Sequence, residues 1–198
     1  IFLLLNLEGK QKLSFLSDYT RYFNKEYQDI TSLFSLPYDE PYRKMRFVSD
    51  NIQNIRLFSV QGDYIREKND ETWEAGVKWG RVKADNTLDF KDEKAGMLVG
   101  NAERTSRFLY KEMIYAGYVS YAKEIDKWSF KAGLRGEYTS LEGNSETIDE
   151  INKQNYFKLF PSVYGLYKPT DGHEIGISYS KRISRPQYSW LNPFRSYY

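Results

Sequence analysis

Residues 127–145, KWSFKAGLRGEYTSLEGNS, alternate between two kinds of side chain over an unusually long run. Polar and charged residues take most of the positions between the apolar ones, and Gly136 is a gap in the apolar series. The apolar set is Trp128, Phe130, Ala132, Leu134 and Tyr138. A period of two predicts a β-strand with one apolar and one polar face. The apolar face must meet either a protein core or lipid.

The same alternation recurs along the chain and predicts about eight strands. The further runs are 13–23, 58–64, 72–84, 114–123, 156–168 and 173–182, and residues 1–7 resemble the end of another strand. No segment shows a helical period. Most runs exceed the usual strand of about 5–6 residues and match the roughly 9–11 residues that cross a bilayer at a tilt. Since no stretch approaches roughly 18 apolar residues, the sequence excludes a transmembrane helix.

The connections between the runs alternate in length. Short turns are predicted at 8–11, 67–71, 125–126 and 169–172, and long polar connections at 25–52, 85–107, 141–155 and from 184 onward. Bacterial transmembrane barrels have short periplasmic turns and longer extracellular loops. The alternation therefore favours an antiparallel up-and-down transmembrane β-barrel, with lipid against the apolar face.

Aromatic side chains lie near the ends of the predicted strands, with the parity of the apolar face. Tyr and Trp suit positions where one end of the side chain is apolar and the other is wet. A membrane aromatic girdle is predicted from Tyr64, Trp73, Tyr121, Trp128, Tyr138, Phe157 and Tyr167. Charged residues of the opposite parity are expected to line a polar lumen; they are Glu74, Lys78, Lys131, Arg135, Glu137, Lys158 and Glu174.

Composition argues against catalysis, cofactors and nucleic acid. The chain has no cysteine and one histidine, so it lacks the residues that nucleophilic dyads and common zinc sites require. We interpret His173 as a solvated turn residue, and Asp85, Asp89, Asp92 and Glu93 as a solvated acidic loop rather than a Ca²⁺ site. A net charge of +2 is too even to predict nucleic-acid binding. We expect no enzymatic activity, no cofactor and no metal.

The C-terminal third resembles a known family. The matching pieces are LFPS at 159–162, SYSKRI at 178–183, RP at 185–186 and LNPF at 191–194, with GLRGEYTSLEGNS at 133–145 and IYAGYVSYAKEI at 114–125 fitting upstream. Together they resemble the outer-membrane β-barrels related to TonB-dependent receptors and transporters of Gram-negative bacteria. The resemblance implies a cell outer-membrane location and uptake of an unidentified nutrient through a polar lumen, with ligand recognition by long extracellular loops.

The resemblance also sets expectations for organisation and partners. Residues 1–198 are expected to form a single barrel region that is a fragment of a larger barrel, without the plug domain and without the C-terminal strands of such families. The implied partners are the lipid bilayer of the outer membrane and, through parts outside this chain, an energy-coupling periplasmic protein and a surface lipoprotein. Candidate ligand-binding residues are Arg182, Arg185 and Trp190.

A soluble alternative remains open at this point. An eight-stranded β-barrel or a sandwich that binds a lipid or carbohydrate would point the same apolar faces inward. That architecture offers no reason for short and long connections to alternate, or for Trp and Tyr to gather beside the short turns.

Overall fold

The structure, a computed structural model, describes residues 1–36, 40, 43–147, 149–170 and 172–182. Within these residues the chain forms nine β-strands and no helix. The strands are β1 (Phe2–Leu7), β2 (Gln11–Phe34), β3 (Arg43–Lys68), β4 (Glu71–Lys94), β5 (Met97–Gly100), β6 (Ser106–Ile125), β7 (Trp128–Ser145), β8 (Glu150–Thr170) and β9 (His173–Ser180).

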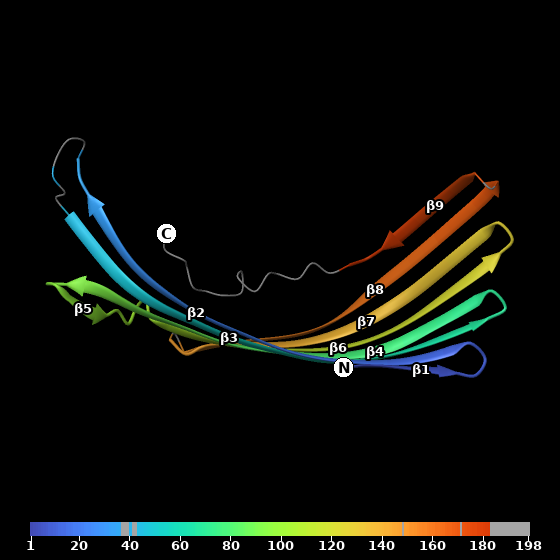
Figure 1. Ribbon diagram of the computed structural model, residues 1–198, viewed down its shortest axis with the longest axis horizontal. Coiled ribbons are helices and arrows are strands. Elements are labelled where there is room, and N and C mark those ends of the chain that lie inside the picture. Colours follow the sequence, from blue (N-terminus) through green and yellow to red (C-terminus); the bar gives the residue numbers. More distant parts are fainter. Residues whose placement is uncertain (37–39, 41–42, 148, 171, 183–198) are drawn as a thin grey trace.

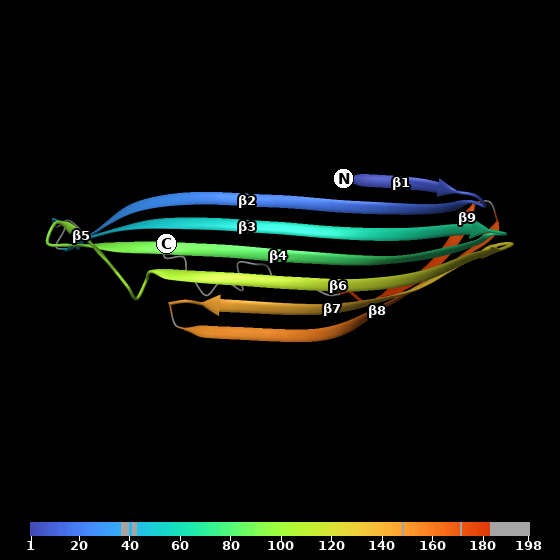
Figure 2. The same cartoon turned by 90° about the horizontal axis from the view of Figure 1, so that it is seen from below.

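Eight of these strands follow one another across a single antiparallel sheet. Their order is β1-β2-β3-β4-β6-β7-β8-β9, and the short β5 pairs with the outer end of β4. Figure 2 shows the long strands side by side, and Figure 1 shows that the sheet curves like a trough. In the described residues the sheet is open, because β1 and β9 each have one neighbour. The predicted up-and-down architecture of about eight strands is confirmed.

Tight turns join the strands at one end of the sheet, on the right in Figure 1. Asn69 and Asp70 between β3 and β4 both have positive φ, of 49° and 61°, as the turn type preferred in two-residue hairpins requires. The turn before β2 likewise places Gly9 and Lys10 at φ of 71° and 56°, and Asp126 before β7 has φ of 47°. The short turns predicted at these three places are therefore present.

The segments predicted as long connections are mostly strand, so that prediction was wrong in its boundaries. β2 continues to residue 34 and β3 starts at residue 43, which places most of 25–52 in the sheet. β4 likewise continues to residue 94, and only residues 146–149 separate β7 from β8. The acidic residues predicted to form a loop accordingly lie in β4. On β4 the sequence concealed the extension because the apolar side chains change face there, as described below.

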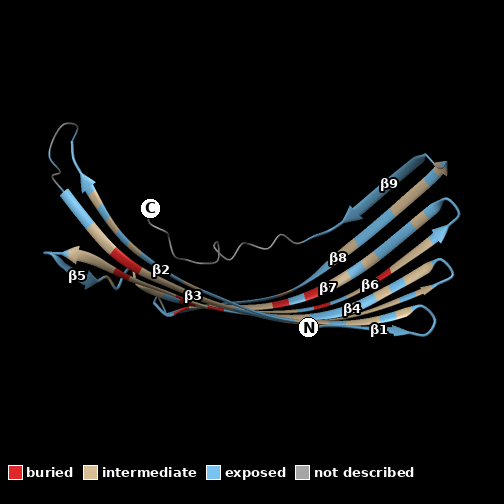
Figure 3. Ribbon diagram, in the orientation of Figure 1, coloured by how far each residue is buried: buried red, intermediate tan, exposed pale blue. Residues whose placement is uncertain are grey.

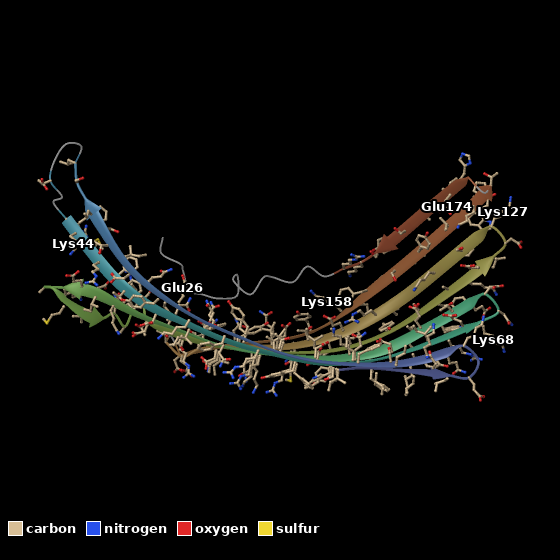
Figure 4. The ribbon with its side chains drawn as sticks, in the orientation of Figure 1. Glu26, Lys44, Lys68, Lys127, Lys158 and Glu174 are labelled. Carbon is tan, nitrogen blue, oxygen red and sulfur yellow. The ribbon has the colours of Figure 1, made fainter. Side chains whose placement is uncertain are left out.

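The curvature distinguishes the two faces of the sheet. We call the face that carries Trp73, Val77 and Trp79 the outward face and the opposite, concave face the inward face. Figure 4 places Glu26 and Lys158 on the concave side. The buried residues belong to the inward set except for Val48; they are Ser49, Ala84, Asn86, Phe90, Phe108, Tyr110, Ala116, Ser120, Glu137, Thr139 and Ser145. Most of them lie in the middle and outer parts of the strands (Figure 3).

Gly76 marks a close approach on the inward face. It lies in register between Asp63 on β3 and Tyr118 on β6. The Tyr118 ring covers the glycine, and its hydroxyl donates a hydrogen bond of 2.7 Å to Asp63 Oδ1. A Cβ at this position would overlap the Tyr118 ring and the Asp63 carboxylate. An aromatic ring that covers a glycine across strands restores the packing that the glycine lacks.

We expect Gly76→Val to lower the free energy of unfolding by about 1–3 kcal/mol, because the new side chain must displace Tyr118 and break its bond to Asp63. The matched control is Gly117→Val, where a Cβ on the outward face meets no atom nearer than 3.9 Å. The stability of both variants is measured by titration with urea. The folded fraction is followed on gels, where unheated folded protein and heated unfolded protein run at different positions. Equal stabilities for the two would contradict the packing described here.

Candidate functional site

The outward face carries a band without charge. In the segments 13–19, 58–64, 73–79, 113–121, 128–138, 157–167 and 175–179, every outward side chain in the described residues is uncharged, and most are apolar or aromatic. We call these side chains the apolar band. Most of them are exposed and none is buried, with Val77 at 67% and Ile177 at 78% of full exposure. An exposed apolar surface that runs across the sheet is unsuited to water.

All seven residues predicted as an aromatic girdle lie on the outward face. Near the tight turns, Trp73 packs on Tyr121 with ring centroids 4.6 Å apart. Trp128 stacks on Tyr167 at 4.3 Å. Tyr64 in the same region donates a hydrogen bond to Gln11 Oε1. Tyr138 and Phe157 are cross-strand neighbours at the other end of the apolar band.

Beyond the apolar band the polarity of the two faces exchanges on β4. On β4 the outward positions become Arg81, Lys83, Asp85, Thr87, Asp89 and Lys91, while the inward positions become Val82, Ala84, Asn86, Leu88 and Phe90. The exchange takes place without any shift in the pairing of β4 with β3 or β6. One continuous strand therefore presents its apolar side chains outward over one half and inward over the other.

Ion pairs hold the charged outer surface together. Arg46 makes a bidentate pair with Asp29 across β2 and β3, at 2.8 and 2.7 Å. The hydrogen bonds from Arg46 hold the pKa of the Asp29 carboxyl below its ordinary value. Glu142 likewise has a lowered pKa, first because Lys153 donates a hydrogen bond to it and then because the charges of Lys111 and Lys153 lie nearby. These carboxylates are ionised at neutral pH.

On the concave side, at the height of the apolar band, polar side chains pair with one another. Gln61 donates hydrogen bonds of 3.1 and 2.8 Å to the Asp63 carboxylate, which also accepts the Tyr118 hydroxyl. On the next strands, Lys131 donates to both oxygens of Glu74 at 3.1 Å. We call these groups, with Ser120, Arg135 and Glu137, the inner-wall network.

The remaining members of the inner-wall network link β4, β6 and β7. Ser120 donates a 3.0 Å hydrogen bond to Glu74, which also pairs with Lys131. Arg135 pairs with Glu137 at 3.1 Å, and the Glu137 side chain is only 6% exposed. Contacts between strands fix Asp63 with Tyr118 and Glu74 with Lys131, whereas Arg135 and Glu137 both belong to β7. The inner-wall network combines carboxylates, cations and hydroxyls on the concave side, where solutes would pass if the sheet surrounds a lumen.

An apolar cluster covers the inward face above the inner-wall network. Ala84, Phe108 and Tyr110 are buried there, and partly buried Ile55, Val82 and Leu141 pack against them. Farther out, Phe47 stacks on Phe90 at 5.0 Å, and the Arg104 guanidinium lies 4.8 Å from the Phe90 ring. The sequence did not predict this cluster, because Ile55, Phe108 and Tyr110 lie outside every predicted strand, and Leu141 and Phe90 lie in predicted long connections. The alternation of residues 82–90 was the signal that could have found it.

The residues predicted to bind a ligand are only partly within the described chain. Arg182 is exposed, two residues past the end of β9. Arg185 and Trp190 lie outside the described residues. His173 is exposed at the start of β9, with Nδ1 3.2 Å from the Thr170 hydroxyl.

Two searches of the described residues gave no site. They hold no group of three or more His, Cys, Asp or Glu side chains placed to bind a metal ion. No helix in this part of the chain has the length and apolarity needed to cross a membrane.

The chain shares its fold with solved receptor structures. The structure of the FpvAI–pyocin S2 complex matches 90% of this chain at 12% sequence identity, with a TM-score of 0.53. The siderophore receptor PiuA from Acinetobacter baumannii matches 86% at 11% identity, with a TM-score of 0.50. The chain covers 26% and 32% of those two chains, so it spans less than a third of either. No curated protein matches it.

The model of the outer membrane protein beta-barrel family matches residues 6–198, which is nearly the whole chain. The uncharged outward band, the polar concave wall and the antiparallel strands joined by tight turns are the features of such a barrel. The chain therefore belongs to the outer membrane protein beta-barrel family and is located in the outer membrane.

Proposed function

We propose that the barrel to which residues 1–198 contribute takes up a nutrient through a polar lumen. The observation that carries this proposal is the opposite chemistry of the two faces at one height: the apolar band outward and the inner-wall network inward. A wall of fixed carboxylates, cations and hydroxyls gives polar solutes hydrogen-bonding partners and keeps the lumen hydrated. The part played by the chain is transport rather than catalysis.

The proposal fixes the orientation of the sheet in the membrane. Tight turns lie on the periplasmic side in barrels of this kind. The pairs of Trp73 with Tyr121 and Trp128 with Tyr167 then lie at the periplasmic interface, and Tyr64 joins them. Tyr138 and Phe157 lie at the outer interface. These seven residues form the aromatic girdle that the sequence predicts.

Recognition of the nutrient belongs to the extracellular end. Because β2, β3 and β4 continue well beyond the apolar band, the recognition loops are short connections carried on long strands. Such loops are positioned by a rigid scaffold, which suits them to ligand contact. Arg182, Arg185 and Trp190 remain candidates on the sequence alone.

The partners proposed for the whole protein are those of an energy-driven receptor. An energy-coupling periplasmic protein would supply the force for uptake, and a surface lipoprotein would assist capture of the nutrient, both through contacts outside these residues. The shared fold with a siderophore receptor supports iron–siderophore complexes as the first solutes to examine.

Uptake by cells with and without the gene tests this function. We expect loss of the gene to abolish accumulation of one solute class from a radiolabelled panel of iron–siderophore complexes, cobalamin and oligosaccharides. A protonophore should abolish the same accumulation in wild-type cells if uptake is energy-coupled. Restoration by the plasmid-borne gene is the control. Unchanged accumulation of every panel member in the deletion strain would contradict the proposal.

A further inference from the structure

The inward face beyond the inner-wall network carries neither lysine nor arginine. This part of the face consists of the inward residues of 18–28, 49–59, 80–90, 106–114, 139–145 and 150–156, which the register places side by side. We call it the vestibule wall. Its charged residues are all acids: Asp18, Glu26, Glu112 and Glu150. Figure 4 shows Glu26 on the concave side of the sheet.

The outward face of the same strand segments is rich in cations. They are Arg21, Lys25, Arg56, Arg81, Lys83, Arg107, Lys111 and Lys153. On the inward face, cations return at the borders of the vestibule wall. Arg104 pairs with Asp92 at one border, and Lys158 at the other lies with Nζ 4.9 Å from the Tyr156 ring. A solute with carboxylate or phosphate groups is therefore repelled by the acids of the wall and meets no cation within it.

Amide side chains are the main polar groups of the vestibule wall. Asn24, Gln53 and Asn86 are direct cross-strand neighbours on β2, β3 and β4. We call them the amide row. In the described part of the chain, five amides of the wall make no hydrogen bond through their side chains; they are Asn24, Asn51, Gln53, Asn152 and Gln154. Each of these amides offers two donors and an acceptor to a solute.

A row of apolar and aromatic side chains lies next to the amide row. Tyr22, Ile55, Ala84 and Tyr110 are successive cross-strand neighbours on β2, β3, β4 and β6. The Tyr22 side chain is accessible, at 50% of full exposure. Each residue of this row is two positions from its counterpart in the amide row, so the two rows are about 7 Å apart. Apolar and hydrogen-bonding surfaces thus alternate on the wall.

This alternation matches the chemistry of an uncharged sugar. A sugar ring has C–H groups on its faces, which pack on an aromatic ring, and hydroxyls at its edge, which bond to amides and carboxylates. From β2 to β8 the wall crosses five strand spacings, or about 24 Å. That width accommodates several linked sugars. A peptide fits the wall less well, because its terminal carboxylate needs a cation.

We infer that the vestibule wall binds a neutral oligosaccharide, which is the solute that the barrel takes up. Asn24 and Gln53 hold sugar hydroxyls, and the Tyr22 ring packs on the face of a sugar. The inference rests on the proposed function, because it requires the concave side to be a lumen whose extracellular end lies away from the tight turns. It favours oligosaccharides over acidic iron complexes as the transported class.

Calorimetric titration of the full-length protein tests the inference. The protein is purified from outer membranes in a detergent without a sugar headgroup. The neutral probes are maltohexaose, cellohexaose and mannohexaose, and the comparison probes are hexagalacturonate, ferric citrate and pentaalanine. We expect at least one neutral probe to bind, and more tightly than any comparison probe. Asn24→Leu with Gln53→Met should weaken that binding roughly 25-fold, since each lost hydrogen bond costs about fivefold.

The matched control is Asn144→Leu with Asn155→Leu, which removes two amides from the outward face of β7 and β8. Its affinity for the neutral probe should stay within about twofold of wild type. Tyr22→Leu should weaken binding about fivefold through loss of the ring. Its control is Tyr27→Leu, an exposed tyrosine on the outward side of β2, which should bind as wild type. Mobility on unheated gels verifies that each variant is folded.

Three results would overturn the inference. The first is the absence of binding by every neutral probe. The second is binding of hexagalacturonate, ferric citrate or pentaalanine at least as tightly as the best neutral probe. The third is an equal loss in the outward-face control. Binding of a neutral probe without its accumulation in cells would contradict the proposed uptake and still support the sugar site, so the two failures are distinguishable.

Discussion

The hydrogen-bond ladder between neighbouring strands is the interaction on which the rest of this structure depends. In lipid no water can satisfy a backbone N–H or C=O, so each strand must pair along its whole length with the next. The register of β3 with β4 and of β4 with β6 runs from the tight turns past the apolar band without a shift. Because the backbone is satisfied by its neighbours, the side chains alone adapt the sheet to its surroundings.

The same ladder serves two environments. Where the sheet crosses the membrane, apolar side chains point outward, and the polar ones are held on the concave side by contacts such as Tyr118 with Asp63 and Lys131 with Glu74. Farther out, water surrounds the convex surface, and ion pairs such as Arg46 with Asp29 replace the apolar side chains there. On β4 and β6 the inward side chains then become the apolar ones, and Phe108 and Tyr110 pack as a small core. The outward cations Arg21, Arg56 and Lys83 lie at the border between the two regimes.

The sequence predicted the membrane half well. A strand with a fully lipid-facing side has an unambiguous period of two, which is why Trp128 to Tyr138 and Trp73 to Trp79 could be assigned to faces. The turns were equally predictable, because Asn69 and Asp70 tolerate the positive φ that a two-residue hairpin needs. The ordered C-terminal motifs predicted the family.

The outer half was not predicted, for a physical reason. Beyond Trp79 on β4, the apolar side chains move from odd-numbered to even-numbered positions. The alternation that identifies the lipid-facing side therefore stops, and the following residues resemble a polar loop. Cross-strand relations were also beyond the sequence. Nothing in the spacing of Arg21, Arg56 and Lys83 along the chain reveals that the register brings them into one row.

The exchange of faces along β4 is the central claim, and site-directed spin labelling tests it most directly. The chain has no cysteine, so single cysteines can carry labels without further changes. In outer-membrane vesicles, labels at Val77 and Trp79 should be relaxed by oxygen and shielded from a water-soluble nickel complex. Labels at Lys83 and Asp85 should show the reverse, and a label at Ala84 should be shielded from both reagents. A lipid-type response that continued through residues 83 and 85, or a water-type response at residues 77 and 79, would contradict the account.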